Sequence, residues 1–196
     1  MIKLAVLALA LLLTACSSSP PPAKQWTSAP SMRIDIAKQY VASIETDRGA
    51  IQVDLLAREA PNTVNNFVFL AREGFYDGVP FHRIIKDFMV QTGDPSGTGR
   101  GGPGYRIIDE PVTLNYDRGA LAMANSGVPN TGASQFFIVQ GANVFLPKTY
   151  TIFGKVTGGL DVLDAIASIP VSASPQGELS VPQEIIKIKR VKVEER

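Results

Sequence analysis

Cysteine and histidine are almost absent from this chain, and their scarcity excludes several kinds of chemistry. Cys16 is the only cysteine, so no disulfide forms within the chain. His82 is the only histidine, which excludes a metal site built on several imidazoles, and no G-x-S-x-G or H-E-x-x-H motif is present. We expect no metal and no cofactor. With 19 basic and 18 acidic residues, the composition also gives no sign of a nucleic-acid partner.

The first residues are typical of an export signal. Residues 1–3 supply a short basic start, and residues 4–13 form an apolar stretch too short to span a bilayer comfortably. The sequence LTAC at residues 13–16 resembles the bacterial lipobox, which implies cleavage before Cys16 and lipid on that cysteine. An ordinary secretory signal with an incidental cysteine is the alternative. Ser17, where a retention signal has Asp, favours a lipid-anchored protein of the outer membrane that faces the periplasm.

We divide the chain into a signal peptide (1–15), a lipidated cysteine with a tether (16–39) and one domain (40–196). Residues 17–30 are rich in Ser, Pro and Ala and lack an apolar period, which is typical of an extended tether. Trp26 within it is interpreted as incidental or interfacial. We expect the domain to be monomeric.

Short strands and two helices dominate the pattern from residue 40 onward. Pro61 favours a helix start, and apolar residues follow at helical spacing until Gly74. A second short helix follows Leu160 and ends at Pro170. Alternating or short apolar runs predict strands at 41–46, 51–55, 81–85, 88–92, 120–124, 135–140 and 151–156.

The last strand needs a local irregularity. Ile186 and Ile188 alternate, as do Val191 and Val193, but the two pairs are out of phase by one residue. A β-bulge near residues 189–190 would place both pairs on one buried face. Few helices among many strands favour a closed or nearly closed antiparallel barrel.

The glycine-rich segment 97–102 and His82 each have a structural interpretation as well as a functional one. Residues 97–102 match G-x-G-x-x-G, yet Pro103 and Gly104 follow where a dinucleotide site needs a helix, so we interpret them as a surface loop. His82 is a possible lone general base, but no recognisable nucleophile accompanies it. We favour a structural role.

Arg83 lies within an apolar run, where burying its guanidinium would cost several kcal/mol unless partners satisfy its donors. Alternation in a strand would put Phe81 and Arg83 on one face, and His82 and Ile84 on the other. The guanidinium would then rest over apolar side chains.

Four segments carry a family resemblance. They are FHRIIKDFMVQ at 81–91, MAN at 123–125, QFFI at 135–138 and FGKV at 153–156. Together they are similar to the cyclophilin family of peptidyl-prolyl isomerases, over about residues 41–194. The resemblance implies a mainly β fold: an eight-stranded antiparallel cyclophilin-like barrel capped by two α-helices, with the active site on its outer face and proline-containing polypeptides as substrates.

The resemblance also assigns roles to residues. Arg83 would donate to the proline carbonyl and towards the twisting prolyl nitrogen, and Gln91 would hold the guanidinium. The substrate-binding positions would be Phe88, Met89, Ala124, Asn125, Gln135, Phe137, Phe145, Leu146 and Tyr150. Phe145 and Tyr150 stand where the commonest eukaryotic pattern has Trp and His, which puts inhibitor and substrate preference in doubt.

The predicted function is peptidyl-prolyl cis-trans isomerisation that assists the folding of exported or envelope proteins. The alternative is a module that binds proline segments of an envelope partner, with incidental catalysis. The enzyme is favoured by the presence together of Arg83, Phe88, Met89, Gln91 and Phe137, since a pure binder would not need the arginine.

Overall fold

The computed structural model describes residues 24–142 and 144–196. The leader and Cys16 therefore lie outside the described residues. The elements are β1 (Tyr40–Thr46), β2 (Gly49–Leu55), α1 (Pro61–Arg72), β3 (Arg83–Ile85), β4 (Met89–Thr92), β5 (Ala120–Met123), β6 (Phe136–Val139), β7 (Ile152–Gly158), α2 (Leu160–Ala167), β8 (Val171–Ala173), β9 (Leu179–Pro182) and β10 (Ile188–Glu195).

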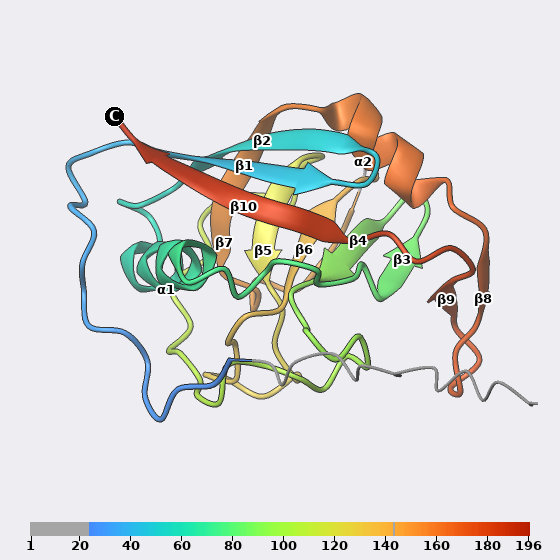
Figure 1. Cartoon of the computed structure of the whole chain (residues 1–196), viewed down its shortest axis with the longest axis horizontal. Helices are drawn as coiled ribbons and strands as arrows, with labels where there is room; N and C mark the ends of the chain where they lie inside the picture. The colour runs from blue at the N-terminus through green and yellow to red at the C-terminus, as the bar shows by residue number, and fades with distance from the viewer. Residues whose placement is uncertain (1–23, 143) are drawn as a thin grey trace, which may run out of the picture.

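Eight strands form one antiparallel sheet in the order β10-β1-β2-β7-β5-β6-β4-β3, which curls around the main core (Figure 1). Its two outer ends are joined where the residues before β3 meet the start of β10. Phe81 N–H donates to the Ile186 carbonyl at 2.9 Å, and Ile188 N–H donates to the Val79 carbonyl at 2.8 Å. The predicted mainly β fold with eight antiparallel strands and two helices is confirmed.

The two helices lie at opposite ends of the curled sheet (Figure 1). Helix α1 has proline at its first position and buries Val64, Phe67, Val68 and Ala71, as the apolar spacing predicts. No helix of the described segments is both long and apolar enough to cross a membrane.

The irregularity predicted in the last strand is present in β10. Glu45 of β1 pairs with Arg190, but the next residue, Thr46, pairs with Ile188, so the register skips Lys189. Ile188 and Val191 are consequently both buried despite their odd spacing. The bulge reconciles the two halves of the strand with one core.

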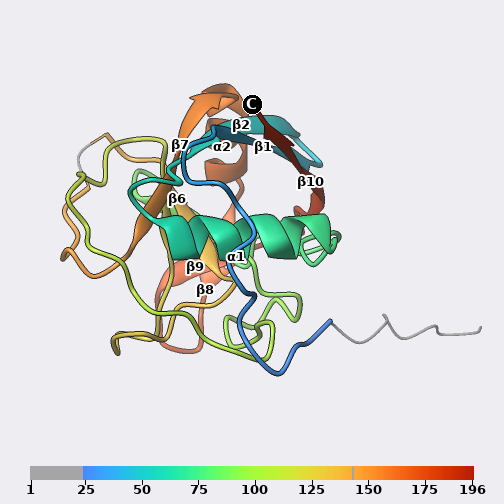
Figure 2. The same ribbon diagram turned by 90° about the vertical axis from the view of Figure 1, so that its left-hand side faces the viewer.

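Part of the segment predicted as a tether packs on the domain. Figure 2 shows the chain before β1 crossing α1. The Trp26 ring lies edge-on to Phe69 with centroids 5.2 Å apart, and the backbone N–H of Trp26 donates to the Pro103 carbonyl at 2.8 Å. Ile34 is 7% exposed and belongs to the main core. Residues 24–39 thus differ from the predicted extended chain, because Trp26 packs on α1 and Ile34 is buried in the main core.

Two local details differ from the sequence expectations. A hairpin of β8 and β9, absent from the predicted elements, follows α2 and pairs as a separate two-stranded sheet. Phe81 does not share a face with Arg83: it is buried in the main core with Ile84, while Arg83 is only half-buried. The reason is that β3 begins only at Arg83, so strand alternation does not extend back to Phe81.

Candidate active site

The outer face of the sheet carries a small pocket of about 280 Å³. Its lining residues are Arg83, Phe88, Met89, Gln91, Ala124, Asn125, Phe137, Leu146 and Tyr150. Nine of the eleven residues that the family resemblance implicates therefore meet in one place. Gln135 lines an adjoining groove instead, and Phe145 lines neither.

Strand register brings the central residues together. Arg83 of β3 pairs with Gln91 of β4, and Gln91 pairs in turn with Phe137 of β6. Residues directly opposite on neighbouring antiparallel strands project to the same side, so the three side chains form one row across the outer face. Val90, the residue before Gln91 on β4, points to the opposite side and is buried in the main core.

The pocket has an apolar floor that is separate from the main core. Met89 and Phe137 are 1% and 5% exposed and form a second cluster, against which Phe88, Leu146 and Tyr150 pack. The rings of Phe137 and Tyr150 meet edge-to-face with centroids 5.5 Å apart. Such a surface can hold a small apolar ring while its rim supplies polar groups.

Arg83 supplies the charge at the rim. Its Nη1 donates to Gln91 Oε1 at 3.4 Å and approaches Met89 Sδ at 3.7 Å. Nε and Nη2 donate to the two carboxylate oxygens of Glu178, each at 2.7 Å. Hydrogen bonding to Arg83 lowers the pKa of Glu178 to about 2. No local pattern in the sequence indicates this pair, since Glu178 lies 95 residues away from Arg83 in the chain.

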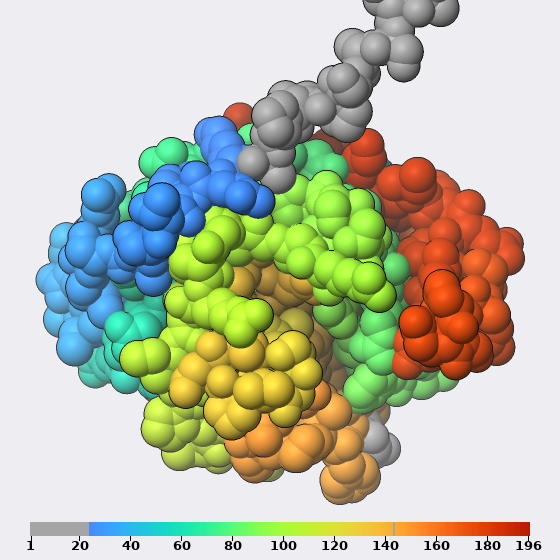
Figure 3. Space-filling view, turned by 90° about the horizontal axis from the view of Figure 1, so that it is seen from below, coloured from blue at the N-terminus to red at the C-terminus, as the bar shows by residue number. Residues whose placement is uncertain are grey.

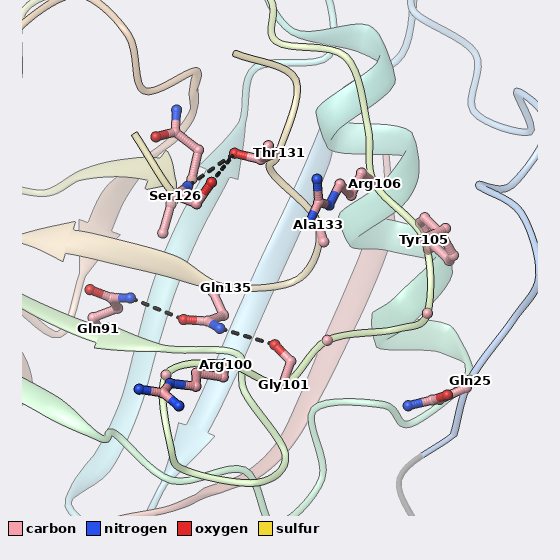
Figure 4. Close-up of a pocket in the computed structure, with 15 residues that line it drawn as sticks. Gln25, Gln91, Arg100, Gly101, Tyr105, Arg106, Ser126, Thr131, Ala133 and Gln135 are labelled. Atoms are coloured by element: carbon pink, nitrogen blue, oxygen red, sulfur yellow. Dashed lines mark hydrogen bonds between the residues drawn. The ribbon is translucent and has the colours of Figure 1, made fainter. Parts of the chain in front are cut away.

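A relay of amides ties Gln91 to a glycine-rich loop. Gln91 Nε2 donates to Gln135 Oε1 at 3.1 Å, and Gln135 Nε2 donates to the Gly101 carbonyl at 3.0 Å (Figure 4). The Gln91 side chain is thereby oriented with its carbonyl oxygen towards Arg83. Gln135, predicted as a groove residue, connects the loop to the site.

An adjoining groove of about 820 Å³ shares Gln91, Ala124 and Asn125 with the pocket. Figure 3 shows this hollowed face, bordered by the loops near residues 100 and 128. Arg100 and Arg106 line the groove and are exposed, and neither forms an ion pair with any described residue.

The glycine-rich loop is wrapped around a buried carboxylate. Asp94 is 0% exposed and accepts hydrogen bonds from the backbone N–H groups of Ser96, Thr98 and Arg100 at 2.7, 3.0 and 3.1 Å. Burial raises the Asp94 pKa, but hydrogen bonds from the Ser96 side chain and loop backbone outweigh it and lower the pKa overall. The next element after the loop is strand β5 rather than a helix, consistent with its interpretation as a surface loop.

Asn125 is held by its own neighbourhood. Its Nδ2 donates to the Thr149 carbonyl at 2.9 Å, and its Oδ1 accepts from Gly127 N–H at 3.0 Å. These contacts fix the side chain at the junction of pocket and groove.

Two residues of interest lie outside the pocket. Phe145 is 94% exposed and lines neither the pocket nor the groove, so its part in substrate binding stays a prediction. The His82 imidazole lines neither cavity, and both its nitrogens are buried without a hydrogen-bond partner among the described residues. Burial lowers the pKa of His82.

Comparisons with known proteins agree on one family. The family model described as cyclophilin type peptidyl-prolyl cis-trans isomerase/CLD matches residues 41–193. Peptidyl-prolyl cis-trans isomerase B of Streptomyces anulatus is 42% identical over 180 residues, which cover 82% of this chain and 100% of that protein. A peptidyl-prolyl cis-trans isomerase of Helicobacter pylori is 47% identical over 137 residues, covering 67% and 83%.

Other relatives differ in length or are known as structures. Peptidyl-prolyl cis-trans isomerase-like 2 of Rhizopus delemar is 45% identical over 163 residues, and the match spans only 30% of that longer protein. The crystal structure of a Cryptosporidium parvum cyclophilin type isomerase in the presence of the dipeptide Ala-Pro superposes with a TM-score of 0.72 at 36% identity, covering 79% of this chain and 98% of that chain.

Within the described residues, no group of three or more His, Cys, Asp or Glu is placed to hold a metal ion.

Proposed function

The chain belongs to the family of cyclophilin-type peptidyl-prolyl cis-trans isomerases, and we propose that its Arg83 pocket catalyses rotation about X-Pro bonds in exported proteins of a bacterial envelope. One observation carries the catalytic part: a guanidinium is held at the rim of an apolar pocket, with Nη1 turned towards Gln91 and Met89. The pocket suits a proline ring, and the guanidinium suits the amide beside it.

The chemistry requires no covalent step. Resonance gives the peptide C–N bond a rotation barrier of about 18–20 kcal/mol. X-Pro bonds therefore exchange in tens to hundreds of seconds. A turnover on the order of 10³ per second needs roughly 7 kcal/mol of transition-state stabilisation. The site must therefore bind the twisted amide more tightly than either planar isomer.

Arg83 supplies that difference as a fixed donor. As the amide twists, the prolyl nitrogen becomes pyramidal and its lone pair leaves resonance with the carbonyl. A guanidinium N–H directed at this nitrogen stabilises the localised lone pair, and a donor already held in place needs little reorganisation. Gln91 keeps Nη1 at the rim, and the Gln135–Gly101 relay keeps Gln91 in turn.

The remaining pocket residues hold the substrate. Met89, Phe137, Phe88, Leu146 and Tyr150 surround the proline ring with apolar surface. Asn125 and Ala124 lie at the junction with the groove, where backbone groups of an extended peptide would pass.

The catalytic proposal is tested by an assay in which X-Pro isomerisation limits the signal. Wild type is expected to accelerate the exchange, and Arg83→Ala to lose at least about 10²-fold of that rate with an unchanged circular dichroism spectrum. Arg190→Ala is the matched control, because it removes an exposed arginine paired with Glu45 on another part of the sheet. Near-normal turnover of Arg83→Ala would overturn the assigned role.

The envelope location is a separate proposal that rests on residues 1–16 of the sequence. A lipobox cysteine with three acyl chains would anchor the domain essentially permanently, since each buried CH₂ contributes about 0.8 kcal/mol. Isomerisation of X-Pro bonds would there assist the folding of exported proteins.

Mass spectrometry of the protein from cells tests the anchor. We expect a mature N-terminus at Cys16 that carries lipid, and loss of processing in Cys16→Ser but not in Ser18→Ala. A mature chain that begins elsewhere with a free thiol at Cys16 would refute the anchor and leave the catalytic proposal intact.

A further inference from the structure

The hairpin after α2 brings a carboxylate to Arg83. Glu178 lies in the turn, directly before β9, and both its oxygens accept hydrogen bonds from Arg83, at 2.7 Å from Nε and 2.7 Å from Nη2. This is the bidentate arrangement in which a planar guanidinium meets a carboxylate most specifically. Figure 1 shows the hairpin beside β3, the strand that carries Arg83.

The hairpin turn fixes where this carboxylate lies. Ser174 N–H donates to the Glu178 carbonyl at 2.7 Å, and Glu178 N–H donates to Ser174 Oγ at 3.2 Å. Gly177, at φ +86°, makes the turn in a conformation that other residues rarely adopt. Glu178 therefore projects from a backbone that is tied on both sides of the turn.

The contacts divide the guanidinium into two edges. Glu178 occupies the edge formed by Nε and Nη2, while Nη1 faces Gln91 and Met89 at the pocket. The bond from Nη1 to Gln91 is long, 3.4 Å, so Gln91 alone holds the guanidinium weakly. Glu178 supplies the two short bonds.

We propose that Glu178 is a positioning residue of the isomerase reaction, which holds the Arg83 guanidinium so that its Nη1 edge stays directed at the proline pocket. This inference rests on the proposed catalytic role of Arg83. The hairpin of β8 and β9 then serves the site as the part of the fold that delivers the second holder of the arginine.

A contribution to folding stability explains the Arg83–Glu178 ion pair less well than a positioning role does. Both side chains are partly exposed, 34% for Arg83 and 41% for Glu178, and exposed ion pairs contribute little to folding. A long arginine side chain has many rotamers, however, and a donor that wanders is a poor catalyst. The value of the pair lies in the orientation that it selects.

The Glu178 carboxylate also neutralises part of the positive charge of Arg83, and this effect alone would weaken the stabilisation of the transition state. Rotation of an amide develops no full charge, so the direction of the N–H donor matters more than the net charge behind it. We therefore expect removal of Glu178 to lower activity rather than raise it.

The experiment measures kcat and peptide affinity separately for the full-length protein in mild detergent. Glu178→Ala is expected to lower kcat roughly tenfold and to change peptide affinity less than about twofold. The loss of kcat is smaller than the ~10²-fold that a misplacement of about 1 Å can cause, because Gln91 still holds Nη1. Glu178→Gln retains one acceptor oxygen for one of the two donors and should fall between Glu178→Ala and wild type. Glu184→Ala is the matched control, because Glu184 is an exposed acid that pairs with Arg48 instead.

Two further readouts show whether Glu178 acts through Arg83. In an Arg83→Ala background, Glu178→Ala should cause no additional loss of kcat. The NMR signal of the Arg83 Nε–H should be slow to exchange with water in wild type and in Glu184→Ala, and fast in Glu178→Ala, whatever the activity.

The outcomes separate this inference from the function on which it rests. An active wild type, an inactive Arg83→Ala and a Glu178→Ala with unchanged or raised kcat would overturn the positioning role alone. An inactive wild type would overturn the proposed function, and the positioning role with it. A tenfold loss in Glu178→Ala that disappears in the Arg83→Ala background is the expected result.

Discussion

Replacing Asp94 with asparagine is expected to loosen the glycine-rich loop beside the active site. The buried carboxylate accepts from Ser96 N–H through Oδ1, and from Thr98 and Arg100 N–H groups through Oδ2. Asparagine has the same shape but only one oxygen. Its amide nitrogen must therefore face backbone donors, and the bonds to Thr98 and Arg100 are lost if the oxygen stays towards Ser96.

The magnitude follows from those two bonds. Hydrogen bonds to a charged group contribute about 1.5–3 kcal/mol each, so the gross loss is about 3–6 kcal/mol. Thr98 and Arg100 are exposed, so water replaces part of the lost bonding, and the neutral amide also avoids the cost of burying a charge. We expect a net loss of about 2–3 kcal/mol in the free energy of unfolding, which for this chain length lowers Tm by about 4–12 °C.

Thermal unfolding of the chain from residue 24 onward measures the effect, with Ser96→Ala as the control. That control removes one hydroxyl donor to Asp94, one bond against the two lost in Asp94→Asn, so its Tm should fall by about half as much. The pKa of Asp94 lies below its ordinary 3.8, so its contribution is present above about pH 4 and disappears as pH falls through the lowered pKa. The wild-type advantage should shrink in that range. Equal melting of Asp94→Asn and wild type at neutral pH would refute the reasoning.

Three other changes give distinct readouts. His82→Gln should stay active, and a loss of turnover without unfolding would instead make His82 catalytic. Because burial lowers the His82 pKa, wild type should lose folding stability as pH falls below about 6.5, and His82→Gln should lose less. The Glu178 carboxyl should titrate by NMR near pH 2 in wild type and return towards 4.5 in Arg83→Ala, and an unchanged midpoint would mean that the pair is not formed in solution. Trp26→Ala should lower the free energy of unfolding, measured by urea titration, by about 1–2 kcal/mol; a fully buried aromatic would cost ~3–5 kcal/mol, but this ring is only half-buried against Phe69. No change would mean that residues 24–39 do not stabilise the domain.

Local patterns predicted the elements well where one face is buried. The spacing of Val64, Phe67 and Val68 predicts α1, and the phase break after Ile188 predicts the bulge in β10. These signals succeed because burial of one face imposes a period on the sequence. Phe81 shows the limit, since alternation holds only while the chain remains a strand.

Contacts between distant segments were harder to foresee. Leu179 and Val181 alternate after a Pro-Gln-Gly turn, which is a weak hairpin signal, but nothing local indicates that Glu178 meets Arg83. Trp26 looks incidental in a Ser/Pro-rich segment until α1 offers it a surface. Likewise, a position in the sequence does not show that the Phe145 ring points to solvent.

Two functions are open to the Arg83 pocket: catalysis of X-Pro rotation by the guanidinium, and binding of proline segments alone. NMR exchange spectroscopy on an X-Pro peptide measures the affinity and the bound isomerisation rate in one experiment, for wild type and Arg83→Ala. If the guanidinium is catalytic, Arg83→Ala binds the peptide within a few-fold of wild type and isomerises it at least about 10²-fold more slowly. Tight binding without exchange in wild type, or equal exchange rates in the two proteins, would contradict catalysis by the guanidinium.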